Sequence, residues 1–229
     1  MGDSLTKDLI NYLSKFVLEE RLELLEEKIN LRSRHLTLVL EDVFQSRNIS
    51  AAIRSADCFG IQDVHIIENK NNYIADKSVS LGASKWISVK QYNSEENNTE
   101  KCIKKLKEEG YQIIATIPQN SDIILDEIDI ENNKIALLLG TEISGLSEKA
   151  LSLADKKMKI NMYGFTESLN ISVSAAICTQ YLSNKMREMK IDWKIKEEEK
   201  DEIMLNWIRN SIKSAKKIED DFMRRRNEK

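Results

Sequence analysis

Glycine and proline are scarce in this sequence of 229 residues, which holds 7 glycines and 1 proline. Gly140 and Gly145 have the spacing of the phosphate-binding loop of nucleotide hydrolases. Leu146 and Ser147, however, stand where that loop requires Lys and Ser or Thr, and no three glycines match the dinucleotide-binding fingerprint. The sequence therefore argues against nucleotide hydrolysis and against NAD chemistry.

Cysteine and histidine are equally rare. Cys58, Cys102 and Cys178 are widely spaced and form no paired motif, so they support neither a disulfide framework nor a zinc knuckle. His35 and His65 have no partner at the spacing of a metal site or of a Ser-His-Asp triad. We expect no metal site, and any chemistry has to proceed without imidazole.

Long apolar runs are missing as well. The longest, 36–40 and 135–139, have the length of strands, and the N-terminus has no apolar signal core. Hydrophobic residues make up 41% and charged residues 32% of the chain, with a formal net charge of -3. This composition predicts a folded, cytoplasmic protein with no membrane partner.

Strands and helices alternate along the middle of the chain. Apolar spacing predicts strands over 36–40, 64–67, 86–89, 111–117, 135–139 and 158–160, and helices over 48–58, 94–109, 147–153 and 168–189. Such an α/β order is typical of a mostly parallel sheet with helices on both faces. Helical spacing also covers 5–31 and 203–222. We therefore expect an N-terminal helical arm over 1–31, a core over 32–190 and a C-terminal helical arm over 191–229.

The first of three loops at strand ends covers residues 45–61. Ligand sites of open parallel sheets lie beyond the carboxyl ends of the strands. A helix that opens at Asn48 and carries Arg54 can receive an anion such as a phosphate. An ordinary Asn cap with a solvated Arg fits the same pattern.

The other two loops are rich in small and polar residues. In 137–147 a buried strand breaks at Gly140, and Glu142 supplies a carboxylate. An ordinary strand-to-helix turn fits the same pattern. In 160–176 the loop delivers Ser168 and Asn170 to the start of a helix with many small residues. Taken alone, this segment is an N-cap followed by a closely packed helix.

Together, and in this order, the three segments resemble the signature motifs of the SpoU/TrmH family of RNA 2′-O-methyltransferases, in the SPOUT superfamily. The match covers roughly 32–190 and rests on Asn48 with Arg54, on Gly140-Thr-Glu142 with Gly145-Leu-Ser, and on Ser168-Leu-Asn170. The resemblance implies an α/β fold whose C-terminal part forms a deep trefoil knot, a homodimer, and S-adenosylmethionine as the cofactor.

The resemblance also assigns roles to single residues. It places the cofactor against Thr116, Leu139, Gly140, Ile160 and Leu169. It makes Arg54 the catalytic arginine, with Asn48, Glu142, Ser168 and Asn170 as the other catalytic-site residues. Because a guanidinium has a pKa above about 12, we favour Arg54 as a positioning group, or as a base only if its pKa is strongly perturbed. The sequence departs from the family at Asn161, where proline is usual, and near Phe165, where methionine is, which implies a less rigid third loop.

A net charge of -3 is unusual for a protein that binds RNA, so basic residues must act locally. The candidates for phosphate contacts are Arg32, Arg34, Lys213, Lys217, Arg224, Arg225 and Arg226. The two helical arms resemble those of family members that methylate a D-loop guanosine of tRNA, which we take as the leading substrate. Methylation of rRNA or of another tRNA position, and a non-catalytic dimeric RNA-binding protein, remain alternatives, with DNA excluded as a partner.

Overall fold

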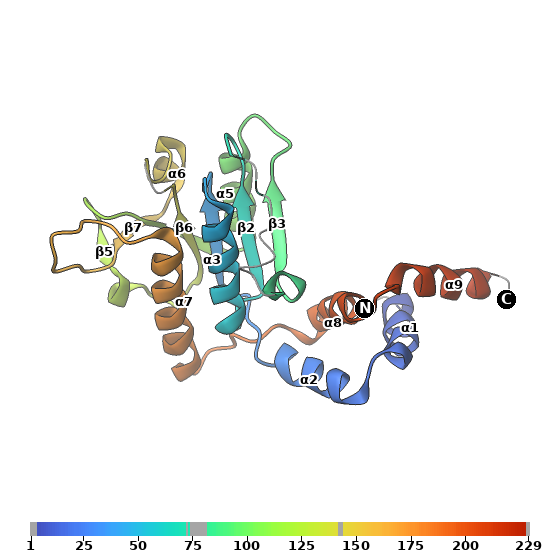
Figure 1. Ribbon diagram of the computed structural model, residues 1–229. Coiled ribbons are helices and arrows are strands. Elements are labelled where there is room, and N and C mark those ends of the chain that lie inside the picture. Colours follow the sequence, from blue (N-terminus) through green and yellow to red (C-terminus); the bar gives the residue numbers. More distant parts are fainter. Residues whose placement is uncertain (1–3, 72, 74–81, 142–143, 228–229) are drawn as a thin grey trace. The chain divides into compact units, whose positions relative to one another are not determined.

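A computed structural model describes residues 4–71, 73, 82–141 and 144–227 (Figure 1). The chain divides into two compact units. Residues 33–193 form one, here called the sheet unit, and residues 1–32 together with 194–229 form the other, here called the helical unit. Glu142, one of the predicted catalytic-site residues, lies outside the described residues.

The sheet unit is built on a seven-stranded sheet in the order β3-β2-β1-β6-β4-β7-β5. The strands are β1 (Leu36–Glu41), β2 (Asp63–Ile67), β3 (Ser88–Tyr92), β4 (Tyr111–Thr116), β5 (Ile123–Ile124), β6 (Lys134–Leu139) and β7 (Lys156–Lys159). Each strand runs parallel to its neighbours. The predicted parallel α/β sheet is therefore confirmed.

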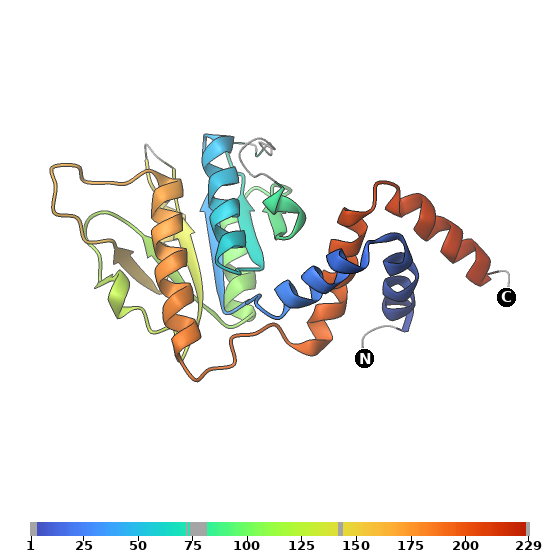
Figure 2. The same cartoon turned by 60° about the horizontal axis from the view of Figure 1, so that its bottom comes forward.

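Helices cover both faces of this sheet. The helices α3 (Ser46–Cys58) and α7 (Ile171–Glu188) lie side by side on one face (Figures 1 and 2), where they pack against Leu137. On the other face α5 (Asn98–Glu108) and α6 (Glu148–Leu153) pack against Leu138. Successive strand residues point to opposite faces, so a continuous apolar run such as that of β6 supplies both cores.

Some element boundaries differ from those that the sequence predicts. Strand β5 is only two residues long and leaves no periodic signal, so it was not predicted. Helix α3 begins at Ser46, after the N-cap Gln45, and not at Asn48. The side chain of Asn48 accepts a hydrogen bond from a residue of another segment, described below.

The helical unit contains α1 (Ser4–Leu13), α2 (Glu19–Ile29), α8 (Glu197–Ser211) and α9 (Ala215–Asn227). Helix α8 packs against α1 and α2 and buries Trp207. The single helix predicted over 203–222 is wrong, because the chain is extended at Ile212. Arg209 pairs with Glu219 across this break, which holds the last turn of α8 to α9. No helix in the described part of the chain is long and apolar enough to cross a membrane.

Candidate active site

The carboxyl ends of three neighbouring strands form a pocket of about 380 Å³. Strand β4 ends at Thr116 and β6 at Leu139, and the chain leaves β7 just before Ile160. Because the strands are parallel, these ends lie at one edge of the sheet. The lining includes Thr116, Leu139, Gly140, Ile160 and Leu169. The structure thus brings together all five residues that the sequence assigned to the cofactor, although this grouping does not test the assignment.

Gly140 is the tightest point of this pocket. A Cβ atom on Gly140 would lie 2.2 Å from the carbonyl carbon of Gly145 and 2.3 Å from the amide nitrogen of Leu146. The loop is closed by two hydrogen bonds, in which the amides of Thr141 and Gly145 each donate to the carbonyl of the other, at 3.0 and 3.1 Å. Only glycine leaves room for this backbone to lie against the end of β6.

One buried polar atom in the pocket wall has no hydrogen-bond partner among the described residues. Thr116 Oγ1 is buried and accepts or donates no hydrogen bond among the described residues. Leu139, Leu146 and Leu169 make much of the remaining lining apolar. A buried hydroxyl without a partner costs free energy, so this wall suits a ligand with an apolar body and a polar edge.

The first and third predicted segments meet at Asn48 and Asn170. Asn170 Nδ2 donates to Asn48 Oδ1 at 3.3 Å, and Asn48 is buried. Asn170 is also the N-cap of α7, because its Oδ1 accepts from the amide of Ser172 at 2.8 Å. Ser168 lies two residues before this cap, is exposed, and lines the 380 Å³ pocket.

Arg54 lies six residues beyond Asn48 on α3, with an exposed side chain. Within the described part of the chain, no hydrogen bond or ion pair engages its guanidinium. A free guanidinium is a strong bidentate ligand for phosphate or carboxylate. The structure therefore leaves Arg54 available to an anion from outside the chain.

Two acidic residues that the sequence analysis did not single out organise this edge of the sheet. Glu41, at the end of β1, is buried and accepts from Ser147 Oγ at 2.7 Å, from the Ser147 amide at 2.8 Å and from Thr99 Oγ1 at 2.6 Å. Ser147 Oγ in turn accepts from the amide of Ala150, as the N-cap of α6. Glu41 thus ties the end of β1 to the starts of α5 and α6.

Asp42 follows directly, with a positive φ of 50°. Its Oδ1 accepts from the amides of Asn69, Lys70 and Asn71, at 2.7, 2.8 and 3.3 Å. The carboxylate therefore shapes the turn after β2. A sequence signal for both residues existed, since two carboxylates follow an apolar strand at the edge where ligands bind.

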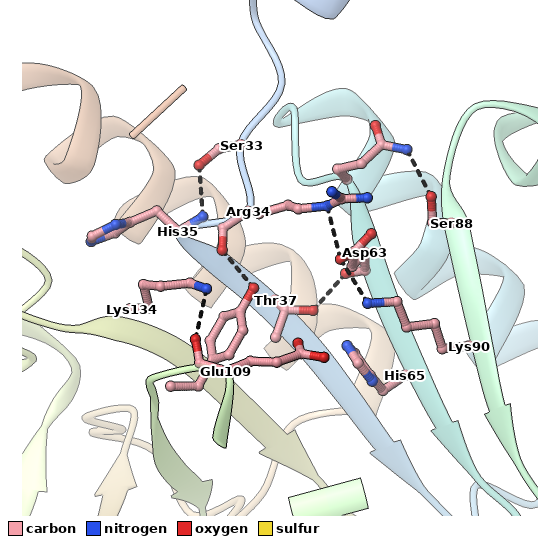
Figure 3. Close-up of polar contacts among 12 residues, drawn as sticks. Ser33, Arg34, His35, Thr37, Asp63, His65, Ser88, Lys90, Glu109 and Lys134 are labelled. Carbon is pink, nitrogen blue, oxygen red and sulfur yellow. Dashed lines mark hydrogen bonds and ion pairs between the residues drawn. The ribbon is translucent and has the colours of Figure 1, made fainter. Parts of the chain in front are cut away.

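Arg34, a predicted RNA contact, lies at the opposite edge of the sheet, where β1 and β2 begin (Figure 3). Its Nε is 3.2 Å from Asp63 Oδ2, and Lys90 Nζ is 3.0 Å from the same oxygen. Asp63 is buried, and these two cations balance the negative charge of its carboxylate. His65, in the same cluster, has its pKa lowered to about 3 by burial, and by the charge of Lys90. The structure therefore places Arg34 in an ion pair of the sheet unit, and its RNA contact stays a prediction.

The remaining predicted RNA contacts belong to the helical unit. Arg32 is buried, with its guanidinium carbon 5.2 Å from the centre of the Trp207 ring. Arg225 pairs with Asp221 at 2.7 Å and Arg226 with Asp8 at 2.5 Å, although both arginines stay exposed. The other exposed cations of the set are Lys213, Lys217 and Arg224. Their roles are untested by this geometry.

The part of the chain that contains these segments matches a known protein family. Residues 35–180 match the model of the SpoU rRNA Methylase family. The chain belongs to this family. A relative from Borreliella burgdorferi, named tRNA (guanosine(18)-2′-O)-methyltransferase, is 42% identical over 220 residues, which are 96% of this chain and 98% of the relative.

Solved structures of SpoU proteins share the fold. The crystal structure of the Aquifex aeolicus TrmH/SpoU tRNA modifying enzyme superposes with a TM-score of 0.72 at 28% identity, covering 83% of this chain and 95% of that one. The SpoU methyltransferase AviRb from Streptomyces viridochromogenes, solved with AdoMet, gives a TM-score of 0.60 at 22% identity, covering 71% and 65%. This second likeness concerns the fold alone. The family resemblance that the sequence motifs suggested is confirmed.

Proposed function

We propose that this SpoU protein is an enzyme that transfers the methyl group of S-adenosylmethionine to the ribose 2′-hydroxyl of a guanosine in tRNA. The pocket at the carboxyl ends of β4, β6 and β7 carries this proposal, because it gathers residues of the second and third motif segments beside the Asn48–Asn170 contact. The name of the Borreliella burgdorferi relative, which this chain matches over nearly its whole length, supports guanosine 18 of tRNA as the target.

The pocket fits the cofactor. Apolar walls from Leu139, Ile160 and Leu169 suit its adenine ring, and Thr116 Oγ1 supplies a buried polar atom that lacks a partner among the described residues. Gly140 keeps the backbone close enough to the cavity to present its amide and carbonyl groups. When bound, the sulfonium supplies an electrophilic methyl group.

The ribose 2′-oxygen must then be held in line with the methyl group, which the chain's own residues do, and its hydroxyl proton must be removed, for which water is the acceptor. Arg54 binds a phosphate next to the target ribose and holds the hydroxyl in line, because a guanidinium is a poor proton acceptor. Asn48 and Asn170 orient the substrate beside Arg54, and Ser168 contributes its hydroxyl at the border of the cofactor pocket. Glu142, outside the described residues, is assigned to the same loop as Gly140.

The catalytic fold includes a C-terminal knot in this proposal. Its support is that the loop after β6 and the segment after β7, which are distant in sequence, line the same pocket. The core over 32–190 carries catalysis, and the helical arms over 1–31 and 191–229 bind tRNA through their exposed cations.

The active form is a homodimer. Exposed large apolar side chains that recur within one short stretch, covering the third segment and the start of α7, support it, because such side chains favour an interface. They are Tyr163, Phe165, Leu169, Val173 and Ile177. Light scattering that gives twice the chain mass of 26.4 kDa agrees with the dimer, and a fully active monomer contradicts it.

The decisive experiment incubates the protein with labelled S-adenosylmethionine and total RNA, and maps the product nucleoside. We expect 2′-O-methylguanosine in tRNA, at position 18. Label in rRNA or at another tRNA nucleotide would show that the substrate is that RNA position and not guanosine 18 of tRNA. RNA binding without any transfer would identify a non-catalytic RNA-binding protein and overturn the proposal.

A further inference from the structure

A second pocket, of about 740 Å³, opens at the carboxyl edge of the sheet. Thr141, Ser144, Gly145 and Leu146 line both this pocket and the 380 Å³ cofactor pocket. The two cavities are therefore separated by one loop. The second cavity therefore adjoins the pocket proposed for the cofactor, and it is a candidate for the base of the nucleotide whose ribose is methylated.

The charge of the second pocket excludes the phosphate backbone as its occupant. Among the described residues of its lining, four carboxylates stand against two ammonium groups. They are Glu41, Asp42, Glu96 and Glu148, against Lys70 and Lys149. Lys149 is moreover paired with Glu100 at 2.6 Å. An acidic cavity repels phosphate and suits a ligand that presents hydrogen-bond donors.

Only part of this lining is free to bind. The carboxylate oxygens of Glu41 and Asp42 already accept hydrogen bonds from Ser147, Thr99 and the amides of the turn after β2. These two residues therefore stabilise the pocket wall. Glu96 and Asn97 are exposed, and their side chains have no hydrogen-bond partner among the described residues. Asn97 is the N-cap of α5 but makes no capping bond with its side chain.

The pocket also offers an aromatic face. Phe44 lines it and is 71% exposed, in the loop between β1 and α3. Burying an exposed phenyl ring is favourable, so a ligand that covers it gains binding free energy. Enzymes that act on single nucleotides stack an unpaired base on such rings. Phe44 stands four residues before Asn48, so the ring lies on the segment that leads to the proposed catalytic residues.

We propose that this pocket binds the guanine base of the nucleotide being methylated, with the base stacked on Phe44 and its Watson–Crick edge bound by Glu96. Guanine is the RNA base that presents two adjacent donors, N1–H and the N2 amino group, which match the two oxygens of one carboxylate. Adenine, cytosine and uracil each place an acceptor beside their donor on that edge. The inference rests on the proposed function and names the residues that select its substrate.

The test of Glu96 uses two tRNA transcripts that differ at the methylated position, which is first mapped with the wild-type protein. One carries guanosine and the other inosine, which lacks the N2 amino group. We expect the wild-type kcat/KM to favour guanosine by tenfold or more, and Glu96→Gln to reduce this preference toward unity, since a lost charged hydrogen bond has about that effect. Glu95→Gln is the matched control, because Glu95 pairs with Lys101 and does not line the pocket.

The test of Phe44 measures stacking. Phe44→Ala should raise KM about tenfold for both transcripts alike, and Phe44→Trp should restore it, because stacking depends on a flat ring and not on the identity of the base. Calorimetry with S-adenosylmethionine and light scattering accompany each variant. Both should match the wild type, which separates a base contact from a damaged cofactor pocket or interface.

The outcomes distinguish this inference from the proposed function. If the wild type methylates a tRNA guanosine while Glu96→Gln keeps the full preference over inosine, or Phe44→Ala keeps its KM, the base pocket is wrong and the proposed function stands. If the wild type transfers no methyl group to any RNA, both are overturned.

Discussion

Asn48 and Asn170, 122 positions apart in the chain, are joined side chain to side chain by a hydrogen bond of 3.3 Å. One residue belongs to the first turn of α3 and the other is the N-cap of α7. The bond therefore connects two helices that lie side by side on one face of the sheet (Figure 1). It also connects the first and third motif segments at the proposed catalytic site.

Substitution of Asn170 should separate its capping role from its catalytic role. Asn170→Ala loses both the cap and the bond to Asn48, so we expect the free energy of unfolding to fall by about 1 kcal/mol and methyl transfer to fall as well. Asn170→Ser keeps a capping oxygen but is too short to reach Asn48. It should retain near-normal stability with reduced kcat, as measured by urea unfolding and initial rates. A normal kcat in Asn170→Ser would remove this contact from the catalytic machinery.

Arg54 should be needed for transfer but not for cofactor binding. Its guanidinium is free within the described structure, and it does not line the cofactor pocket. We expect Arg54→Ala to lower kcat by at least a hundredfold, and Arg54→Lys to recover little, because an ammonium lacks the planar fork. Calorimetry should give an unchanged Kd for S-adenosylmethionine. Near-normal turnover by the alanine variant would disprove the assignment.

Two glycines of the motif segments should respond differently to the same added methyl group. At Gly140 a Cβ atom would collide with the backbone of Gly145, so we expect Gly140→Ala to disrupt the loop and weaken S-adenosylmethionine binding by tenfold or more. At Gly164 a Cβ atom meets nothing within 4 Å, and φ is not in the left-handed region. Gly164→Ala should therefore bind the cofactor normally. Equal behaviour of the two variants in calorimetry would contradict the pocket geometry.

The buried His65 should make the protein less stable in mild acid. Its pKa is lowered to about 3 from the usual 6.5, mainly by burial, so below pH 6.5 the unfolded chain binds a proton that the folded chain rejects. The free energy of unfolding should fall as the pH drops from 6.5 towards 3, by up to about 1.4 kcal/mol per pH unit from this group. Urea unfolding at pH 7 and pH 5 measures the change. His65→Gln should show a smaller change over this interval, and an equal change would assign the effect to other groups.

The arginines that end α9 should contribute to tRNA affinity through phosphate contacts. Arg224, Arg225 and Arg226 are exposed, and neutralising all three to Gln should weaken binding and flatten the log-log dependence of affinity on salt, by roughly one unit of slope per lost contact. Lys104→Gln on α5 is the control, because Lys104 is an exposed cation of the sheet unit that the proposal does not assign to tRNA binding. Cofactor binding should stay unchanged in both. Equal salt slopes for the wild type and the triple variant would show that α9 does not contact the RNA.

The order of strands and helices in the sheet unit follows from local patterns in the chain. Apolar runs such as 36–40 and 135–139 are strand-length, and helical spacing between them leaves the parallel sheet as the arrangement that covers both faces. The three motif segments were recognisable because Gly140, Asn48 and Asn170 lie at a strand end or at helix starts, and Arg54 follows Asn48 at a fixed short spacing, so that short-range residue spacing carries the signal. For the same reason the family could be inferred before any contact was known.

Contacts between segments distant in sequence decided which partners the polar side chains of the site have. Asn48 looked like a helix cap in the sequence, but helix α3 starts at Ser46 and the side chain of Asn48 meets Asn170. Glu41 and Asp42 were not singled out in the sequence, and their oxygens bind groups of α5, α6 and the turn after β2. No local pattern encodes such partners. A buried polar atom must find a hydrogen bond wherever the fold brings one, and that place depends on the packing of the whole sheet and its helices.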